Sequence, residues 1–200
     1  MRTTQRDVLV ATAERLFADH GIDAVSLRTV MAEAGTNVAA VRYHFGTKDA
    51  LVEAVVRARS EEIRAARDAL LTALEEAPSP TLRDLAEAFV LPLAAMASAG
   101  DVEWIRLVAG VTASGHPAMS VIDEEFAGQT DRLGRLLRRV NPGLDAVGRR
   151  FRLTVAMTLA YRTLGDLGDL RTRVAAPGRP PVTDERLVRE LVDAVAGILE

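Results

Sequence analysis

The chain has 200 residues, with 25 Lys and Arg against 28 Asp and Glu, which gives a net charge of −3. A chain of this length can bury a sizeable core without a covalent staple. It has no cysteine, which excludes a disulfide scaffold, a thiol nucleophile and a cysteine-ligated metal. Its three histidines show no HExxH spacing, so neither a metal site nor a cofactor is expected. The negative charge argues against nucleic acid binding unless a local basic patch exists.

No segment is apolar for long enough to span a membrane. The longest apolar run covers residues 88–97 and contains Pro92, whereas a spanning helix needs about 20 residues. The first residues are too charged to form a signal peptide. We therefore expect a soluble, cytoplasmic protein with no membrane partner.

Helical periodicity runs along the chain, and no segment shows the sustained alternation of a strand. All eight prolines lie after residue 77, so Gly21, Gly35 and Gly46 divide the first part into helices. The expected N-caps are Thr4, Ser26, Asn37, Thr47 and Thr183. The expected helices span residues 4–20, 26–34, 38–45, 47–77, 81–98, 101–113, 117–140, 144–167 and 183–199. Residues 168–181 are predicted to form a loop, and the fold class is all-α with about nine helices.

Residues 26–45 are predicted to form two short helices joined by Gly35-Thr36-Asn37. This spacing is typical of a helix-turn-helix, whose second helix enters the major groove of DNA. It is equally the spacing of a plain helical hairpin in a hydrophobic core. The residues on the outer face of the second helix therefore have to distinguish the two possibilities.

The expected helix at residues 38–45 buries Val38, Val41 and Phe45 on one face. Its other faces carry small or hydrogen-bonding side chains, namely Ala39, Ala40, Arg42, Tyr43 and His44. Small residues permit close approach to a thymine methyl, and the polar ones can reach phosphates or base edges. Residues 36–48 contain no acid, and the only lysine, Lys48, opens the next helix. A cation there opposes the helix dipole, which favours a docked phosphate at that position.

The stretch GTNVAAVRYHFGTKDAL, residues 35–51, resembles the signature of the TetR family of repressors. Phe17, Gly21 and Ser26-Leu27-Arg28 fit the first two helices of the same pattern, so the resemblance covers residues 5–56. It implies a homodimer of two-domain helical subunits that binds a palindromic operator in double-stranded DNA. It also implies release from DNA when a small, hydrophobic effector enters the C-terminal domain.

The resemblance further implies a helix-turn-helix DNA-binding domain over residues 1–47 and a ligand-binding and dimerisation domain over residues 48–200. The implied DNA contacts are Arg28, Thr36, Asn37, Ala39, Ala40, Arg42, Tyr43, His44, Thr47 and Lys48. Arg42 departs from the asparagine that many relatives carry there, so the operator sequence cannot be carried over from them.

In the C-terminal half, residues 104–110, Phe126 and Phe151-Arg152 are similar to a branch of the family that includes fatty-acid-responsive regulators. A pocket is expected between the fourth to eighth expected helices, which span residues 47–167. Its candidate lining residues are Phe89, Met96, Trp104, Met119, Phe126, Met157 and Tyr161, with Arg106 and His116 as candidates for binding a polar head group. The alternatives are an ordinary core for the apolar set, an ion pair for Arg106 and a loop cap for His116.

Two helices are candidates for a dimer interface. A helix that is apolar on more than one side needs partners on more than one side, and two operator half-sites require a symmetric dimer. The candidate residues are Phe151, Val155 and Leu159 in the helix at 144–167, and Leu187, Leu191, Val195 and Ile198 in the last helix. The alternative is that both faces are covered within one subunit.

Enzymatic motifs are absent from the sequence, and no catalytic residue is assigned. Gly46-Thr47-Lys48 lacks the upstream glycine of a phosphate-binding loop, and Ser114-Gly115-His116 lacks a third orienting group. We therefore expect no enzymatic activity. The remaining alternative to a DNA-binding regulator is a helical interaction module that does not bind DNA.

Overall fold

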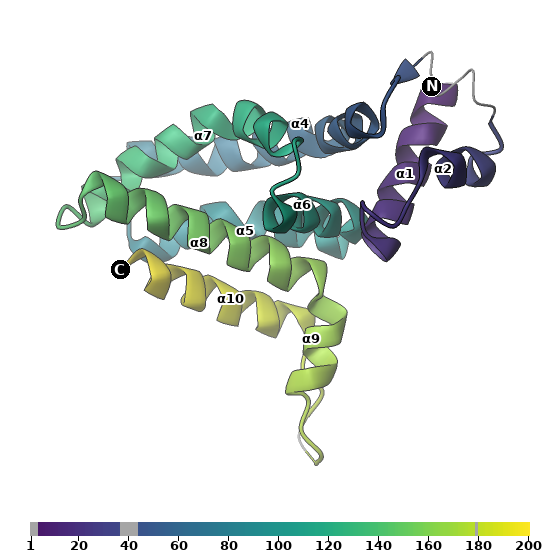
Figure 1. Ribbon diagram of the computed structural model, residues 1–200. Helices are drawn as coiled ribbons and strands as arrows, with labels where there is room; N and C mark the ends of the chain where they lie inside the picture. The colour runs from purple at the N-terminus through teal and green to yellow at the C-terminus, as the bar shows by residue number, and fades with distance from the viewer. Residues whose placement is uncertain (1–3, 37–43, 179) are drawn as a thin grey trace.

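The computed structural model describes residues 4–36, 44–178 and 180–200, and every regular element within these ranges is a helix (Figure 1). The elements are α1 (Gln5–His20), α2 (Leu27–Glu33), α4 (Lys48–Glu76), α5 (Leu82–Ser98), α6 (Val102–Ser114), α7 (Met119–Val140), α8 (Ala146–Gly165), α9 (Leu167–Val174) and α10 (Asp184–Leu199). The prediction of an all-α fold with about nine helices is confirmed. The expected helix at residues 38–45 falls mostly outside the described residues.

The helix starts follow from the capping residues that the sequence indicates. Thr4 and Asp7 form a complete capping box, in which the Thr4 N–H donates to Asp7 Oδ2 at 2.9 Å and the Asp7 N–H donates to Thr4 Oγ1 at 3.2 Å. Ser26, Thr47 and Thr183 also accept a backbone N–H from the first turn of their helices. The expected cap at Asn37 lies outside the described residues.

The 29-residue helix α4 runs along the molecule and packs against α1 at one end and against α5, α6 and α7 along its length (Figure 1). Helix α6 is fixed to α4 by Trp104, which is completely buried. Its indole N–H lies 3.1 Å from the Val55 carbonyl oxygen and 3.0 Å from that of Val56, and it donates to both. Helices α5, α8 and α10 pack together on the other side of the molecule.

The prediction of a loop at residues 168–181 is wrong for its first part, because α9 occupies Leu167–Val174. The prolines of this segment begin only at Pro177, so they do not interrupt the helix. Asp169 in the first turn and Arg171 in the last turn match the helix dipole. Arg171 also pairs with Asp184 at 3.0 Å, which ties α9 to the start of α10.

No helix among the described residues is both long and apolar enough to cross a bilayer. The same residues contain no cluster of His, Asp and Glu side chains that could hold a metal ion.

Candidate nucleic-acid interface

Helices α1 and α2 and the first turn of α4 gather at one end of the molecule (Figure 1). The segment that joins α2 to α4 is bounded by two glycines with positive φ, Gly35 at 62° and Gly46 at 73°. Glycine adopts this conformation without the steric cost of a side chain. The two glycines therefore set the direction in which the chain leaves α2 and enters α4.

Helix α2 is held against α1 by an ion pair and by its buried apolar face. Arg15 of α1 pairs with Glu33 at the end of α2, with a nitrogen–oxygen distance of 2.6 Å. Val30 faces inward and is completely buried. The opposite side of α2 carries Arg28, which is exposed and forms no hydrogen bond or ion pair with any described residue. The fold thus presents Arg28 outward on a fixed helix.

The remaining predicted DNA contacts divide into described and undescribed residues. Thr36 is half-buried, and its N–H donates to the Met31 carbonyl at 3.0 Å. His44 is half-buried, and its ring centroid lies 6.0 Å from that of Phe45. Five predicted contacts lie outside the described residues, namely Asn37, Ala39, Ala40, Arg42 and Tyr43.

At the start of α4, one residue caps the helix and the next places a cation at its N-terminus. The Thr47 hydroxyl caps the helix by accepting the Ala50 N–H at 3.1 Å. Lys48 extends its ammonium toward the α1–α2 loop, where Nζ donates to the Asp23 carbonyl at 3.4 Å. Lys48 remains partly exposed. This bond fixes the ammonium beside the helix N-terminus, where the helix dipole also attracts an anion.

Arg6 is a basic residue at this end that sequence reasoning missed. Its guanidinium carbon lies 5.5 Å from the centroid of the Phe45 ring, in a cation–π contact. Arg6 is exposed on the first turn of α1. Because Arg6 and Phe45 are distant in sequence, no local pattern could have indicated that they meet.

Polar contacts connect this end to the rest of the molecule. Asp49 lies 3.6 Å from His116 Nε2, and Arg59 pairs with Asp101 at 2.6 Å. The other ring nitrogen of His116, Nδ1, accepts the Ala118 N–H at 3.1 Å. His116 therefore caps its loop and contacts α4, and it does not line either of the two cavities described below.

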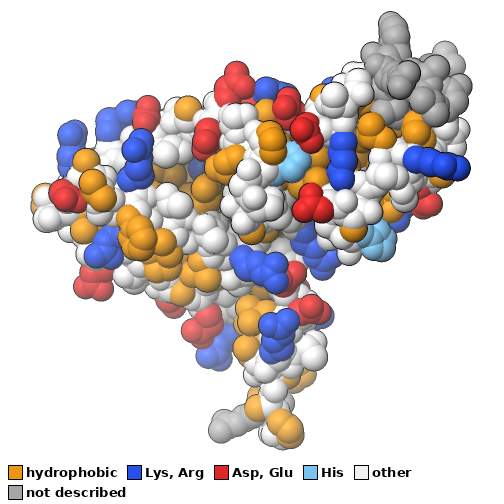
Figure 2. Space-filling model, viewed as in Figure 1, with side chains coloured by type: hydrophobic (Ala, Val, Ile, Leu, Met, Phe, Trp, Pro, Cys, Tyr) orange, Lys and Arg blue, Asp and Glu red, His pale blue; other side chains and the backbone are white. Residues whose placement is uncertain are grey.

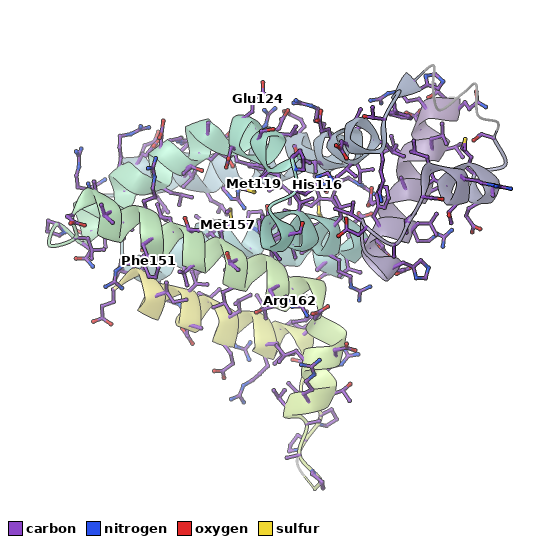
Figure 3. All side chains as sticks on the ribbon, viewed as in Figure 1. His116, Met119, Glu124, Phe151, Met157 and Arg162 are labelled. Carbon is purple, nitrogen blue, oxygen red and sulfur yellow. The ribbon has the colours of Figure 1, made fainter. Side chains whose placement is uncertain are left out.

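The predicted pocket residues do not all meet in one cavity. A cavity of about 670 Å³ lies between α7 and α8 and includes Phe89, Phe126 and Met157 in its lining. Figure 3 shows Met157 on the side of α8 that faces α7. Met96, Trp104 and Tyr161 are buried in the core, and Met119 packs against it. Arg106 binds the Gly165 carbonyl at 2.7 Å instead of a carboxylate, and so joins α6 to α8.

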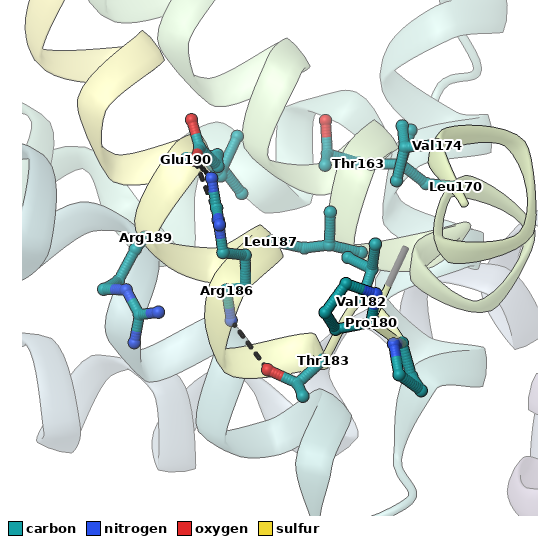
Figure 4. Close-up of a pocket in the computed structure, with 12 residues that line it drawn as sticks. Thr163, Leu170, Val174, Pro180, Val182, Thr183, Arg186, Leu187, Arg189 and Glu190 are labelled. Atoms are coloured by element: carbon teal, nitrogen blue, oxygen red, sulfur yellow. Dashed lines mark hydrogen bonds and ion pairs between the residues drawn. The ribbon is translucent and has the colours of Figure 1, made fainter. Parts of the chain in front are cut away.

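A second cavity, of about 720 Å³, lies between α8, α9 and the start of α10 (Figure 4). Its apolar lining comes from Leu170, Val174, Pro180, Val182 and Leu187. None of the predicted pocket residues lines it.

The candidate dimer residues also separate into two groups. Leu187, Leu191 and Val195 are at most 7% exposed, because this face of α10 packs against α5 and α8 of the same subunit. For these three residues the alternative is therefore correct, because helices of the same subunit cover this face of α10. Phe151 on α8 is 67% exposed and has Val147, at 76%, one turn before it. Val155, Leu159 and Ile198 are half-buried.

Two family models match the chain. Residues 9–55 match the model described as bacterial regulatory proteins, tetR family. Residues 87–197 match the model described as a tetracycline-repressor-like C-terminal domain. Together they cover the candidate interface and most of the helical C-terminal part. No curated protein matches the chain.

Solved structures of similar fold cover nearly the whole chain. A putative TetR-family transcriptional regulator from Rhodococcus sp. has a TM-score of 0.67 at 16% identity, over 98% of this chain and 99% of its own. The ketosteroid transcriptional regulator of Mycobacterium tuberculosis has a TM-score of 0.60 at 17% identity, over 98% and 95%. A fatty acid degradation regulator from Bacillus halodurans has a TM-score of 0.62 at 14% identity, over 98% and 96%. At these identities the likeness is one of fold.

Proposed function

The chain belongs to the tetR family of bacterial regulatory proteins, a family of DNA-binding transcriptional regulators, and from that premise we propose that it is a ligand-responsive repressor. In this proposal a homodimer binds a palindromic operator, and a small, apolar effector releases it. Residues 1–47 form the DNA-binding domain, residues 48–200 bind the effector and form the dimer, and Lys48 at the boundary also contacts DNA. No catalytic step is part of the proposal.

The observation that carries the DNA-binding proposal is the basic surface around the helix-turn-helix. Arg6, Arg28 and Lys48 come from three different helices, and all three lie at one end of the molecule. The connecting segment 36–48 contains no acid. Cations at the surface attract phosphates, and small residues such as Ala39 and Ala40 allow a helix to approach the base edges.

A dimer has two DNA-binding ends, one for each half-site of the operator. We place the interface on the outer face of α8, at Val147 and Phe151, with Val155 and Leu159 following at the same helical spacing. Two large exposed apolar side chains one turn apart are costly in water and are covered in a dimer. Ile198 of α10 is retained as a candidate. Leu187, Leu191 and Val195 are buried within their own subunit and are no longer candidates for direct contact with the partner.

Effector release follows from a shift between two conformations. The effector must bind the conformation whose two DNA-binding ends are wrongly spaced more tightly than the competent one. The α7–α8 cavity is our proposed effector site, since its volume lies within the usual range for ligand pockets, about 300–1,000 Å³. Phe89, Phe126 and Met157 contribute its apolar walls.

The experiment that tests this function is a selection of bound fragments from random DNA at low salt, followed by gel shifts on the enriched sequence. We expect a palindrome whose half-sites are about one helical turn apart, as the docking of paired helix-turn-helix units requires. A double variant, Arg28→Ala with Lys48→Ala, is the matched control and should enrich nothing. Failure of the intact protein to enrich any palindrome would favour the alternative, a helical interaction module.

A further inference from the structure

Arg67, near the middle of α4, is the most unusual charge in the described part of the chain. It is 4% exposed, yet it forms no ion pair with any described carboxylate. One terminal nitrogen donates to Gln129 Oε1 and the other to the Phe89 carbonyl oxygen, both at 3.4 Å, and the buried hydroxyl of Tyr161 also lies beside the guanidinium. Its Nε is buried and has no hydrogen-bond partner among the described residues.

Such an arrangement is costly for the free protein. A buried guanidinium without a counter-ion loses hydration worth several kcal/mol, and distant neutral acceptors recover only part of that loss. The rings of Phe89 and Phe126 lie 5.0 Å and 5.6 Å from its guanidinium carbon and offer cation–π attraction. These contacts hold the side chain in place, but they do not neutralise its charge. An apolar residue of similar size could fill the same space without this desolvation cost.

The cavity between α7 and α8 lies next to this charge. Phe89 and Phe126, the two rings that contact the Arg67 guanidinium, also line the cavity. Arg67 is therefore one side chain away from it. The rest of the apolar lining comes from Ala146, Ile122, Leu133, Leu153 and Met157. Such a wall accepts an apolar chain and excludes water from the charge beyond it.

The rim of the same cavity is basic. Arg135 and Arg138 of α7 and Arg150 of α8 form no hydrogen bond or ion pair through their guanidinium groups with any described residue. Asp123 and Asp131, also on the rim, form no ion pairs. Figure 2 shows basic, acidic and apolar side chains interspersed over the end of the molecule that lies opposite the helix-turn-helix. The rim thus favours the entry of an anion.

We propose that the effector is an amphipathic carboxylate whose head group pairs with Arg67 and whose apolar chain fills the α7–α8 cavity. This proposal rests on the proposed function, which places a small effector in this domain. Entry requires the Phe89 or Phe126 ring to turn aside, so that the carboxylate meets the unpartnered Nε. Because Arg67 belongs to α4, the helix that begins at Lys48, the new ion pair acts directly on the helix that carries the DNA-binding end.

The test compares two probes with the same chain length, decanoate and 1-decanol, by calorimetric titration below the micelle-forming concentration. We expect the intact protein to bind decanoate at least about tenfold more tightly, because a charge-assisted hydrogen-bonded pair is stronger than a bond between neutral groups. In Arg67→Met this preference should disappear while binding of 1-decanol persists. The variant should fold, because an apolar residue of similar volume often replaces a buried ion at no loss of stability.

Arg150→Met tests the rim as the alternative head-group site, since Arg150 is exposed on the rim of the same cavity. Arg173→Met is the matched control, since Arg173 is exposed on α9 and does not line the cavity. Both variants should keep the preference for decanoate. Loss of the preference in Arg150→Met but not in Arg67→Met would overturn the assignment of the head group. Equal binding of both probes by the intact protein, or binding of neither, would overturn the proposed effector class, and neither result depends on whether the variant folds.

Operator binding by the same preparation separates this proposal from the proposed function. A protein that binds its operator but does not prefer decanoate is still a regulator with a different effector. A protein that prefers decanoate but enriches no palindrome binds the ligand without the proposed regulation.

Discussion

Lys48 illustrates how one side chain serves both the fold and the candidate interface. The bond to the Asp23 carbonyl holds the α1–α2 loop, yet at 3.4 Å it is long for an N–H···O bond. A single partly exposed bond of this kind stabilises the fold by at most about 1 kcal/mol. We infer that the main role of Lys48 is to hold a phosphate at the N-terminus of α4.

Replacing Lys48 by alanine tests that role. Lys48→Ala should weaken operator binding and lower the salt dependence by about one counter-ion per subunit, because one phosphate contact is lost. The measurement is a gel shift or anisotropy titration over a range of salt concentrations. Arg189→Ala, at an exposed residue of α10 far along the chain, is the control and should change neither quantity. A large fall in the melting temperature of Lys48→Ala would contradict this role, because it would show that Lys48 mainly stabilises the fold.

Glu14 on α1 is a buried acid whose ionisation opposes folding. Burial raises the pKa of its carboxyl, and the nearby charge of Arg59 offsets this only in part. A carboxyl with a raised pKa in the native state contributes stability that is present below its unfolded pKa and is lost as the pH rises through the native pKa. At neutral pH the ionised group therefore destabilises the protein.

Glu14→Gln should consequently raise the melting temperature at about pH 7, because glutamine has no charge to desolvate. The gain should shrink as the pH falls through the ordinary glutamate pKa, below which the carboxyl is protonated in the native and the unfolded protein alike. Calorimetric melts across this pH range check the prediction. Glu53→Gln, on α4 and half-exposed, is the matched control; a similar gain there would contradict burial as the cause.

At the scale of single elements, α8 has three different surfaces. Ala156, Ala160 and Leu164 are buried against the rest of the subunit. Leu153 and Met157 face the cavity. Phe151, with Val147 before it, is turned to solvent. A helix at the surface of a monomer needs an apolar side only where it faces the core. The exposed apolar surface at Val147 and Phe151 therefore supports the proposed dimer.

A charge on this outer surface should prevent dimerisation. In Phe151→Glu an unpaired carboxylate would be buried at the interface, at a cost of about 3 kcal/mol or more, which corresponds to a dimer at least about a hundredfold weaker. Sedimentation analysis should detect monomers, and operator binding should fall with them. Leu70→Glu, at an exposed leucine of α4, is the control and should remain dimeric. A Phe151→Glu protein that stays dimeric would place the interface elsewhere.

At the scale of the whole molecule, the net charge of −3 conceals an uneven distribution. The first 60 residues carry eight basic and seven acidic side chains, so the acidity belongs to the remainder. In the proposed function the small basic surface gives only weak non-specific attraction to DNA. Specific binding would then depend on two such surfaces held at a fixed spacing by the proposed dimer.

The proposed site and the DNA-binding end should influence each other equally. Linkage requires that an effector which weakens operator binding by some factor is itself bound more weakly by that factor in the presence of operator. We expect decanoate to lower operator affinity, and operator DNA to lower decanoate affinity, by the same factor within error. Paired titrations measure both. Decanoate binding that leaves operator affinity unchanged would show that the two sites are not coupled.

The sequence by itself determined the features that depend on neighbouring residues. Thr4, Ser26, Thr47 and Thr183 cap helices because their side chains meet N–H groups two or three residues ahead. Apolar spacing located the helices for the same local reason. The helix-turn-helix was recognisable because its turn and its outer face lie within one short segment. The loop prediction that failed, at α9, relied on prolines that lie beyond the helix.

Only the tertiary structure decided which surfaces meet. Periodicity marks a face of α10 as buried, but whether α5 or a second subunit covers Leu187 depends on how the whole chain packs. Arg67 looks in the sequence like any arginine on a polar helix face, and only the meeting of α4, α5 and α7 removes it from water. The same packing brings Arg6 to Phe45 and Lys48 to Asp23. Contacts between distant residues follow from the burial of apolar area summed over the molecule, which no local pattern records.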